Sequence, residues 1–244
     1  MRLVIDAGNT TIGVGLFAND KLVKSISVRK ELCESLSTFF KENKEQIDDI
    51  VYSSVTPHMD DKLLLDIKKN SSCRILLVNQ KLKFGFDFKQ YENIQIGADL
   101  LADLEAGIHK YETPMLICDL GTASKILCID KDGKFSSCAI IPGMELSGKS
   151  LMKNAELLPE IGLNVPKSAL GKNTVEAMNI GIVLGHAYLI SGLASRFEKE
   201  LGYKCRKILT GGTGTLLQEE LAKDGFIYDA NLCLEGLNII GNMN

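Results

Sequence analysis

The chain has 244 residues, of which 45% are hydrophobic, 24% charged and 6% aromatic, with no Trp. This length suits one large or two small domains with a substantial core. The net charge of −3 argues against a nucleic-acid surface, which needs an excess of clustered Lys and Arg, and so few aromatic residues provide no evident platform for base stacking.

The seven cysteines are an odd number without CxxC spacing and lie mostly within apolar runs, which predicts small buried side chains in a reducing compartment. Met1 and Arg2 lead directly into the first expected strand, which leaves no room for a signal peptide, and no apolar run approaches the ~20 residues of a membrane span. We therefore expect a cytoplasmic protein that binds neither membranes nor nucleic acids.

The first stretch of the chain, residues 3–17, predicts a β-hairpin. Two runs of apolar and small residues, 3–5 and 12–17, flank a polar turn at residues 6–11. An ordinary hairpin turn accounts for this pattern about as well as a ligand-binding turn does.

The turn carries the residue types that hold a polyphosphate and its Mg²⁺. Gly8 lets the backbone amides approach a bulky anion, and its neighbours add short side-chain donors: Asn9, Thr10 and Thr11. A carboxylate at the end of an apolar strand, here Asp6, requires a cation, a metal-bound water or amide donors.

The elements that follow alternate between strands and helices. We expect strands at 22–29, 47–53 and 74–78, helices at 31–46, 57–70 and 96–108, and a polar and aromatic connector at 79–96. This order predicts a mixed sheet covered by helices.

Asp99 in the first turn of the third helix is the candidate general base. The helix dipole and free amides keep such a carboxylate ionised, and it could accept the proton of an attacking hydroxyl. Capping of the helix is the alternative role for Asp99. Asp103 and Glu105 are expected to be solvated.

The second half of the chain repeats the first. Residues 116–130 align with the first stretch at an offset of 113, which sets Asp119 on Asp6 and Gly121 on Gly8. The repeat predicts two domains of like fold, 1–114 and 115–244, with their Asp-x-Gly turns converging on one ligand in a cleft.

The remaining elements of this half are also indicated by pattern. Strands are expected at 115–119, 124–130, 134–140 and 206–209, helices at about 144–154 and at 173–201, and a strand-helix region at 232–240. The glycine-rich stretch 210–214 suits adenosine or a sugar, or it serves the turn alone. His58, His109 and His186 have no acid or Cys at triad or ligand spacing, so a hydrolase triad or a zinc site fits poorly.

An ordered set of short motifs resembles the type III pantothenate kinases over nearly the whole chain. The motifs are Asp6-Ala-Gly-Asn-Thr, Gly97-Ala-Asp99, Asp119-Leu-Gly-Thr-Ala, Ile141-Pro-Gly, Gly171-Lys-Asn-Thr174 and Thr210-Gly-Gly. The resemblance implies an α/β fold of two ribonuclease H-like, actin-like ATPase domains with a nucleotide cleft between them. It also implies ATP-dependent phosphorylation of the primary hydroxyl of pantothenate to 4'-phosphopantothenate, the first step toward coenzyme A.

The resemblance assigns roles to single residues as well. Those implied to bind ATP are Asp6, Ala7, Gly8, Asn9, Thr10, Thr11, Ile12, Gly13, Gly121, Thr122, Thr210, Gly211 and Gly212. Those implied to bind pantothenate are Tyr91, Gly97, Ala98, Asp99, Leu100 and Thr174. Asp99 is implied as the proton acceptor, Asp6 as a ligand of Mg²⁺ through water, and Asp119 as the ligand of K⁺ or NH₄⁺. Two chains are implied to form a homodimer in which each completes the other's pocket.

Three positions depart from the family pattern. Leu100 stands where the family has Arg, Tyr91-Glu-Asn-Ile94 lacks the usual Pro, and Lys125 replaces a small or polar residue. The first two lie on the pantothenate side, and an apolar side chain cannot supply a guanidinium. A kinase of the same fold with another small hydroxylated acceptor, and a non-catalytic homologue that binds nucleotide, therefore remain as alternatives.

Overall fold

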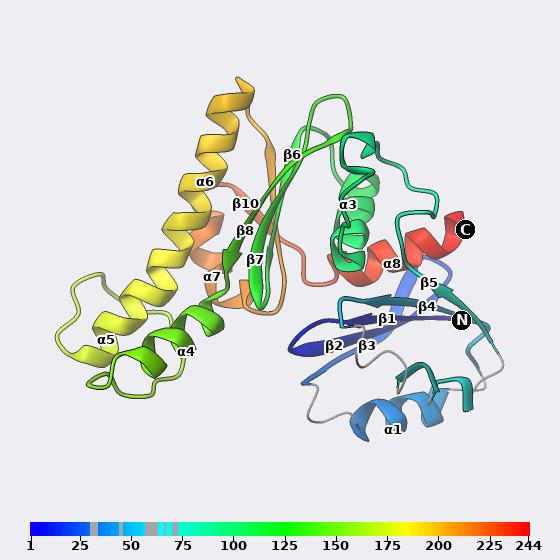
Figure 1. The fold of residues 1–244 in the computed structure, drawn as a ribbon, viewed down its shortest axis with the longest axis horizontal. Helices are drawn as coiled ribbons and strands as arrows, with labels where there is room; N and C mark the ends of the chain where they lie inside the picture. The colour runs from blue at the N-terminus through cyan, green and yellow to red at the C-terminus, as the bar shows by residue number, and fades with distance from the viewer. Residues whose placement is uncertain (30–33, 44–45, 57–62, 66, 70–72) are drawn as a thin grey trace. The chain divides into compact units, whose positions relative to one another are not determined.

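The structure, a computed structural model, describes the whole chain except residues 30–33, 44–45, 57–62, 66 and 70–72. The chain forms two compact units, one of Met1–Lys110 with Asn231–Asn244 and the other of Tyr111–Ala230 (Figure 1). The expected boundary at 114/115 falls near the change of unit. The expected extent of the second domain, 115–244, needs correction, because the last segment packs with the first unit.

Each unit is built on a five-stranded sheet. The elements of the first unit are β1 (Arg2–Ala7), β2 (Thr11–Ala18), β3 (Lys21–Arg29), α1 (Glu34–Asn43), β4 (Asp49–Ser54), β5 (Arg74–Leu77), η3 (Lys89–Tyr91), α3 (Ala98–Lys110) and α8 (Leu232–Met243). Those of the second are β6 (Met115–Leu120), β7 (Ala123–Ile129), β8 (Phe135–Pro142), α4 (Met144–Asn154), α5 (Thr174–Asn179), the π-helical η4 (Ile180–Leu184), α6 (Gly185–Leu201), β9 (Arg206–Thr210), α7 (Gly214–Ala222) and β10 (Phe226–Tyr228).

The two sheets have the same topology. Their strand orders are β3-β2-β1-β4-β5 and β8-β7-β6-β9-β10. In each sheet the first three strands form an antiparallel meander, and the last two are added in parallel. Short turns can join antiparallel strands, whereas parallel pairing needs a longer crossover. The two domains of like fold that the repeat predicted are confirmed, as is each strand expected from 3 to 140 and at 206–209, within a few residues.

Alternation along β1 assigns its side chains to the two faces of the first sheet. Leu3, Ile5 and Ala7 are buried in a core that includes Phe39 of α1. Arg2 points to the opposite face, where α8 packs. The expected helix 31–46 is confirmed as α1 within the described residues, while the helix expected at 57–70 falls largely outside them.

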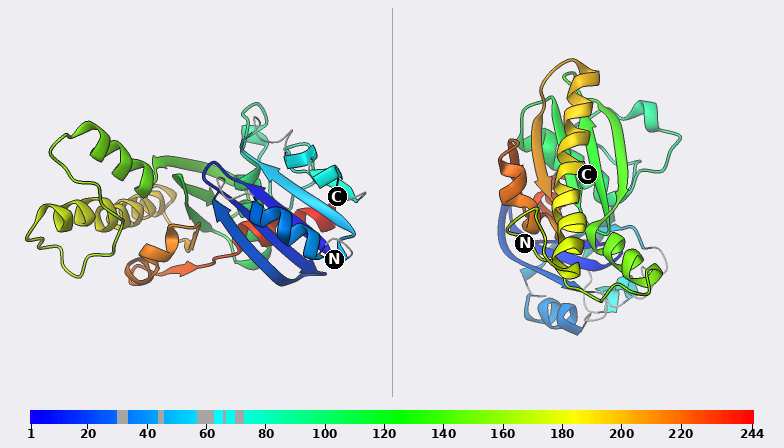
Figure 2. Two further views of the ribbon diagram at one scale, coloured as in Figure 1. Left: turned by 90° about the horizontal axis from the view of Figure 1, so that it is seen from below. Right: turned by 90° about the vertical axis from the view of Figure 1, so that its left-hand side faces the viewer.

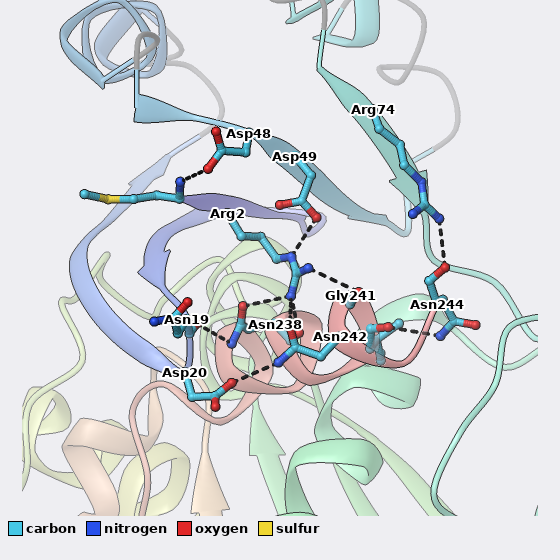
Figure 3. A network of polar contacts seen from close by, with 12 residues as sticks. Arg2, Asn19, Asp20, Asp48, Asp49, Arg74, Asn238, Gly241, Asn242 and Asn244 are labelled. Atoms are coloured by element: carbon cyan, nitrogen blue, oxygen red, sulfur yellow. Dashed lines mark hydrogen bonds and ion pairs between the residues drawn. The ribbon is translucent and has the colours of Figure 1, made fainter.

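Arg2 joins β1 to the last turns of α8. Its Nε donates to Asp49 Oδ2 at 2.9 Å, its Nη1 to the Asn238 carbonyl at 2.9 Å, and its Nη2 to the Gly241 carbonyl at 3.2 Å (Figure 3). The last carbonyls of a helix lack partners within the helix, and a cation at that end is also favoured by the helix dipole. This contact explains why the end of the chain belongs to the first unit.

Helix α8 also packs closely against α3. A side chain at Gly236 would overlap the Ala102 carbonyl, so only glycine fits at this crossing. The strand expected within residues 232–240 is absent from this described segment, which is helical throughout. Leu232, Leu237 and Ile240 are all fully buried, as the helical period requires.

In the second unit, α6 lies along one face of the sheet (Figures 1 and 2). The expected helix 173–201 is confirmed in extent, with Asn173 as its N-cap accepting from the Glu176 amide at 2.9 Å. Contrary to expectation, Thr174–Leu201 is long and apolar enough to cross a membrane, with a mean hydropathy of 1.5 in its best window. Half of that window is buried inside the protein, and a core helix meets the same criterion.

Asp103 and Glu105 of α3 are buried, which corrects the expectation that both are solvated. Glu105 Oε2 accepts from the Gly85 amide at 2.8 Å, and Oε1 lies 3.1 Å from His109 Nδ1. Burial raises the pKa of the Glu105 carboxyl above its usual value, because desolvation outweighs the opposing effects of the Gly85 amide and His109. Glu105 thus holds the aromatic connector in place, although burial of its carboxyl group is itself unfavourable.

We expect Glu105→Gln to stabilise the protein increasingly as the pH rises. With the folded pKa above the unfolded one, the folded state binds more protons just above pH 4.5, so the free energy of unfolding falls through that window. Gln keeps an acceptor for Gly85 and removes this dependence. Thermal melts from pH 4.5 to neutral should show the Tm of the variant gaining on wild type, by roughly 2–4 °C per kcal/mol. The exposed Glu92→Gln serves as control, and a constant Tm difference for Glu105→Gln would contradict the assignment.

Candidate active site

Asp6 lies near the carboxyl end of β1, between β2 and β4. The parallel register sets it beside Ser53, whose buried hydroxyl donates to Asp6 Oδ1 at 3.0 Å. On the other side its antiparallel partner is Gly13. The carboxylate is half-buried and oriented by a hydroxyl, and carboxylate oxygen is the ligand that Mg²⁺ prefers.

The turn after Asp6 is closed by one backbone hydrogen bond, from the Gly8 amide to the Thr11 carbonyl at 3.0 Å. Asn9 and Thr11 are exposed, so their side chains can meet a ligand. Ile12 is buried in the core, so its role in binding is limited to backbone atoms. The predicted hairpin turn is thus present as a tight, polar tip.

Asp99 lies at the same edge of the sheet as Asp6. Val55, which follows β4, donates its amide to the Ala7 carbonyl at 3.2 Å. A Cβ on Gly97 would lie 3.5 Å from Val55 Cγ1 and 2.5 Å from Asp99 Oδ1. Asp99 Oδ1 also accepts from the Leu100 amide at 2.9 Å. The missing side chain of Gly97 therefore leaves the space that the Asp99 carboxylate occupies.

Tyr91 and Thr174, which the resemblance implies for pantothenate binding, lie outside the segment at 97–100. Tyr91 ends η3 in the connector and is half-buried. Thr174 begins α5 of the second unit, where it is exposed. Ala98 is buried, whereas Leu100 is half-buried at the start of α3.

Asp119 occupies in β6 the position that Asp6 occupies in β1. Its parallel neighbour is Thr210 of β9, and its antiparallel partner is Lys125 of β7. Lys125 Nζ lies 2.6 Å from Asp119 Oδ2, with 14% and 15% of the two side chains exposed. The carboxylate is therefore neutralised by a lysine of the same sheet.

The glycine-rich stretch after β9 lies against the turn that joins β6 to β7. Gly211 has φ +89°, and a Cβ there would lie 2.5 Å from both Asp119 Oδ1 and the Leu120 carbonyl oxygen. Thr213 Oγ1 donates to the same carbonyl at 2.8 Å. The turn itself is closed by the Gly121 amide on the Ala123 carbonyl at 3.2 Å. The structure thus brings together the segments at 119–122 and 210–213, which sequence reasoning placed separately at strand ends.

The Ile141-Pro-Gly motif closes on the same turn, because the Gly143 amide donates to the Thr122 carbonyl at 3.0 Å. Thr122 is exposed at its tip. Thr122 is therefore held by its backbone while its side chain faces solvent.

The residues at Asp119 do not fit a monovalent cation. The resemblance implied K⁺ or NH₄⁺ there, but one carboxylate oxygen is bound to the Lys125 ammonium. Among the residues that the structure describes, no group of three or more His, Cys, Asp or Glu is arranged to hold a metal ion.

A mainly apolar pocket of about 640 Å³ lies within the second unit. Its walls include Ile141, Thr174, Ile182, His186 and Leu189. His186 Nε2 is 2.7 Å from the buried Ser124 Oγ, and burial lowers the pKa of the imidazole. No sequence spacing signals this pair, since 62 residues separate its members. His58 lies outside the described residues.

Comparison with known proteins identifies the family. The model of the type III pantothenate kinases matches residues 2–196. The chain belongs to the type III pantothenate kinase family. The type III pantothenate kinase of Persephonella marina is 31% identical over 247 residues, with 97% of this chain and 96% of that one covered. That of an Exiguobacterium species is 32% identical over 254 residues, covering 100% and 99%.

Solved structures agree on the fold of this pantothenate kinase family member. A Baf family protein from Campylobacter jejuni matches with a TM-score of 0.62 at 20% identity, covering 98% of this chain and 97% of the other. MreB5 of Spiroplasma citri, solved with AMPPNP, matches with a TM-score of 0.52 at 12% identity, covering 99% and 96%. The actin-like ATPase fold of two mixed sheets flanked by helices is confirmed.

We expect Gly211→Ala to destabilise the second unit by more than the strain of a positive φ alone would. Alanine there meets both a strained φ and three close atoms, whereas Gly225 has φ +83° and its Cβ would meet no atom of the described residues within 4 Å. Gly225→Ala should cost about 1 kcal/mol, and Gly212→Ala, with open space and no positive φ, less. Urea unfolding of the three variants measures the order. Equal losses of unfolding free energy for Gly211→Ala and Gly225→Ala would show that the contact between position 211 and Asp119 is looser than described.

Proposed function

We propose that this protein transfers the γ-phosphoryl group of ATP to the primary hydroxyl of pantothenate in the cytoplasm, giving 4'-phosphopantothenate for coenzyme A synthesis. Family membership along nearly the whole chain supports this proposal most strongly. The presence of Asp6, Asp99 and Asp119 at strand or helix ends agrees with it.

In the first unit, the hairpin tip binds phosphate. The amides of residues 8–13 and the side chains of Asn9, Thr10 and Thr11 supply donors, as polyphosphate recognition requires. Asp6, oriented by Ser53, would hold Mg²⁺ through water. The metal would supply positive charge to the phosphate oxygens.

In the second unit, the turn at Gly121 and Thr122 also takes part in binding ATP. Thr210, Gly211 and Gly212 bind its adenosine part, since the glycine backbone can lie flat against a ligand. The close packing of Gly211 on Asp119 supports this role, because it fixes the loop beside the turn.

Asp99 accepts the proton of the pantothenate hydroxyl as phosphoryl transfer proceeds. Phosphoryl transfer needs little covalent chemistry from the protein, so positioning of the alcohol is its main task. The hydrogen bond from the Leu100 amide and the space left by Gly97 hold the carboxylate in one orientation.

Pantothenate binding involves Gly97, Ala98 and Leu100 around this base, with Tyr91 and Thr174. Leu100 offers an apolar contact where the family pattern has a guanidinium, so the substrate carboxylate needs another donor. ADP release measured with pantothenate, and with a panel of small hydroxylated acceptors, tests the acceptor directly. Turnover with another acceptor but none with pantothenate would overturn the assignment.

The active form is proposed to be a homodimer. The second unit exposes many large apolar side chains, among them Leu157, Leu170, Val175, Tyr188 and Leu189. Large apolar side chains that form a contiguous exposed patch are typical of an interface. Its helices α5 and α6 carry three of these residues beside Thr174, which agrees with a pocket completed by a second copy.

Tyr188→Glu should convert the dimer into monomers. Its side chain is 64% exposed in one chain, so a charge there costs little in folding but much in an apolar interface. Light scattering after gel filtration measures the mass. Leu77→Glu, 48% exposed on β5 of the first unit, is the matched control and should leave the mass unchanged. A wild type that is monomeric at all concentrations would refute the dimer.

Asp99→Asn should strongly reduce turnover while leaving ATP binding intact. Asn retains an acceptor for the Leu100 amide but cannot take up the proton, so kcat should fall by ~10²-fold or more. Calorimetry with a non-hydrolysable ATP analogue measures binding. Asp87→Asn, which also keeps its hydrogen bond to a backbone amide, is the control. Wild-type turnover in folded Asp99→Asn would show that another group is the base.

A further inference from the structure

The ion pair between Lys125 and Asp119 is fixed by the backbone of the second sheet. The two residues are directly opposed in the β6–β7 register, so their side chains leave the same face at neighbouring positions. The ammonium reaches Asp119 Oδ2 at 2.6 Å without bridging any loop.

Both charges lie largely out of water, which makes the contact stronger than a surface ion pair. Only 14% of the Lys125 side chain and 15% of the Asp119 side chain are exposed. A carboxylate with so little solvent requires a cationic or donor partner, and removal of one member leaves the other charge buried and uncompensated.

The same carboxylate borders the nucleotide-binding loops. Its Oδ1 would lie 2.5 Å from a Cβ on Gly211 and 3.9 Å from one on Gly121. A second cation on Asp119 would therefore lie close to the lysine ammonium, and like charges within ~4–6 Å disfavour one another.

We propose that Lys125 is a tethered cation which takes the place of a free monovalent cation at Asp119, so that the enzyme works without K⁺ or NH₄⁺. The inference rests on the proposed kinase function. The ammonium supplies the positive charge beside the second phosphate turn in every protein molecule, whatever the salt. The chemistry of phosphoryl transfer is unchanged, since the lysine only stabilises charge.

Turnover in the absence of small monovalent cations is the first test. Wild-type activity in choline chloride should match that in KCl or NH₄Cl of equal ionic strength within about twofold, because screening is then the same. Lys125→Ala should lose about 10²-fold in choline chloride, the lower end of the scale for loss of one preorganised donor. K⁺ or NH₄⁺ should restore it, because they can enter the space that the lysine ammonium leaves beside the Asp119 carboxylate.

Two further variants separate this role from a general effect of charge. Lys131→Ala removes an exposed lysine just beyond the end of β7 and should respond to salt as wild type does. In Lys125→Ala combined with Asp119→Asn, K⁺ should no longer restore activity, since the neutral amide does not attract the ion.

Binding measurements decide the question independently of turnover. The Tm and the ATP affinity of wild type should be equal in KCl and choline chloride, whereas Lys125→Ala should gain in both when K⁺ replaces choline. A wild-type enzyme that turns over only with K⁺ or NH₄⁺, or a folded Lys125→Ala that is active without them, would overturn the inference and leave the kinase function standing. Nucleotide binding with no turnover in any salt would instead refute the kinase function, and the Tm comparison would still decide the role of Lys125.

Discussion

The positions of Asp6 and Asp119 depend on one constraint, which is the register of the antiparallel hairpin that opens each unit. In both sheets the aspartate lies on the central strand, between a hairpin partner and a parallel strand. The parallel neighbour carries a hydroxyl in each case, Ser53 beside Asp6 and Thr210 beside Asp119. Because register fixes all three positions together, a slip of one residue would turn the carboxylate to the other face.

The hairpin partner is where the two units differ. Opposite Asp6 stands Gly13, which has no side chain to place against the carboxylate. Opposite Asp119 stands Lys125, which places an ammonium there. One scaffold, used twice, thus sets a glycine opposite the aspartate in one unit and a lysine ammonium opposite it in the other.

The first unit depends on the end of the chain for its completeness. Helix α8 lies against α3 where Gly236 allows backbone contact, and Arg2 ties its last turns to β1 and β4. Helix α3 carries the proposed base, Asp99, in its first turn. Packing against α8 fixes the opposite face of this helix. Chain connectivity alone would have assigned α8 to the second unit.

Apolar periodicity and turn residues are local signals, so the repeated strand-turn-strand pattern, the extent of most helices and strands, and the acids at strand ends could be predicted from the sequence. Packing between distant elements places α8 in the first unit, buries Glu105 against Gly85 and brings Ser124 to His186. The tertiary structure also decided that Lys125 neutralises Asp119, although the departure at position 125 was visible in the sequence. These contacts form when elements that are distant in the sequence pack together. A local sequence pattern does not indicate which side chains will then meet.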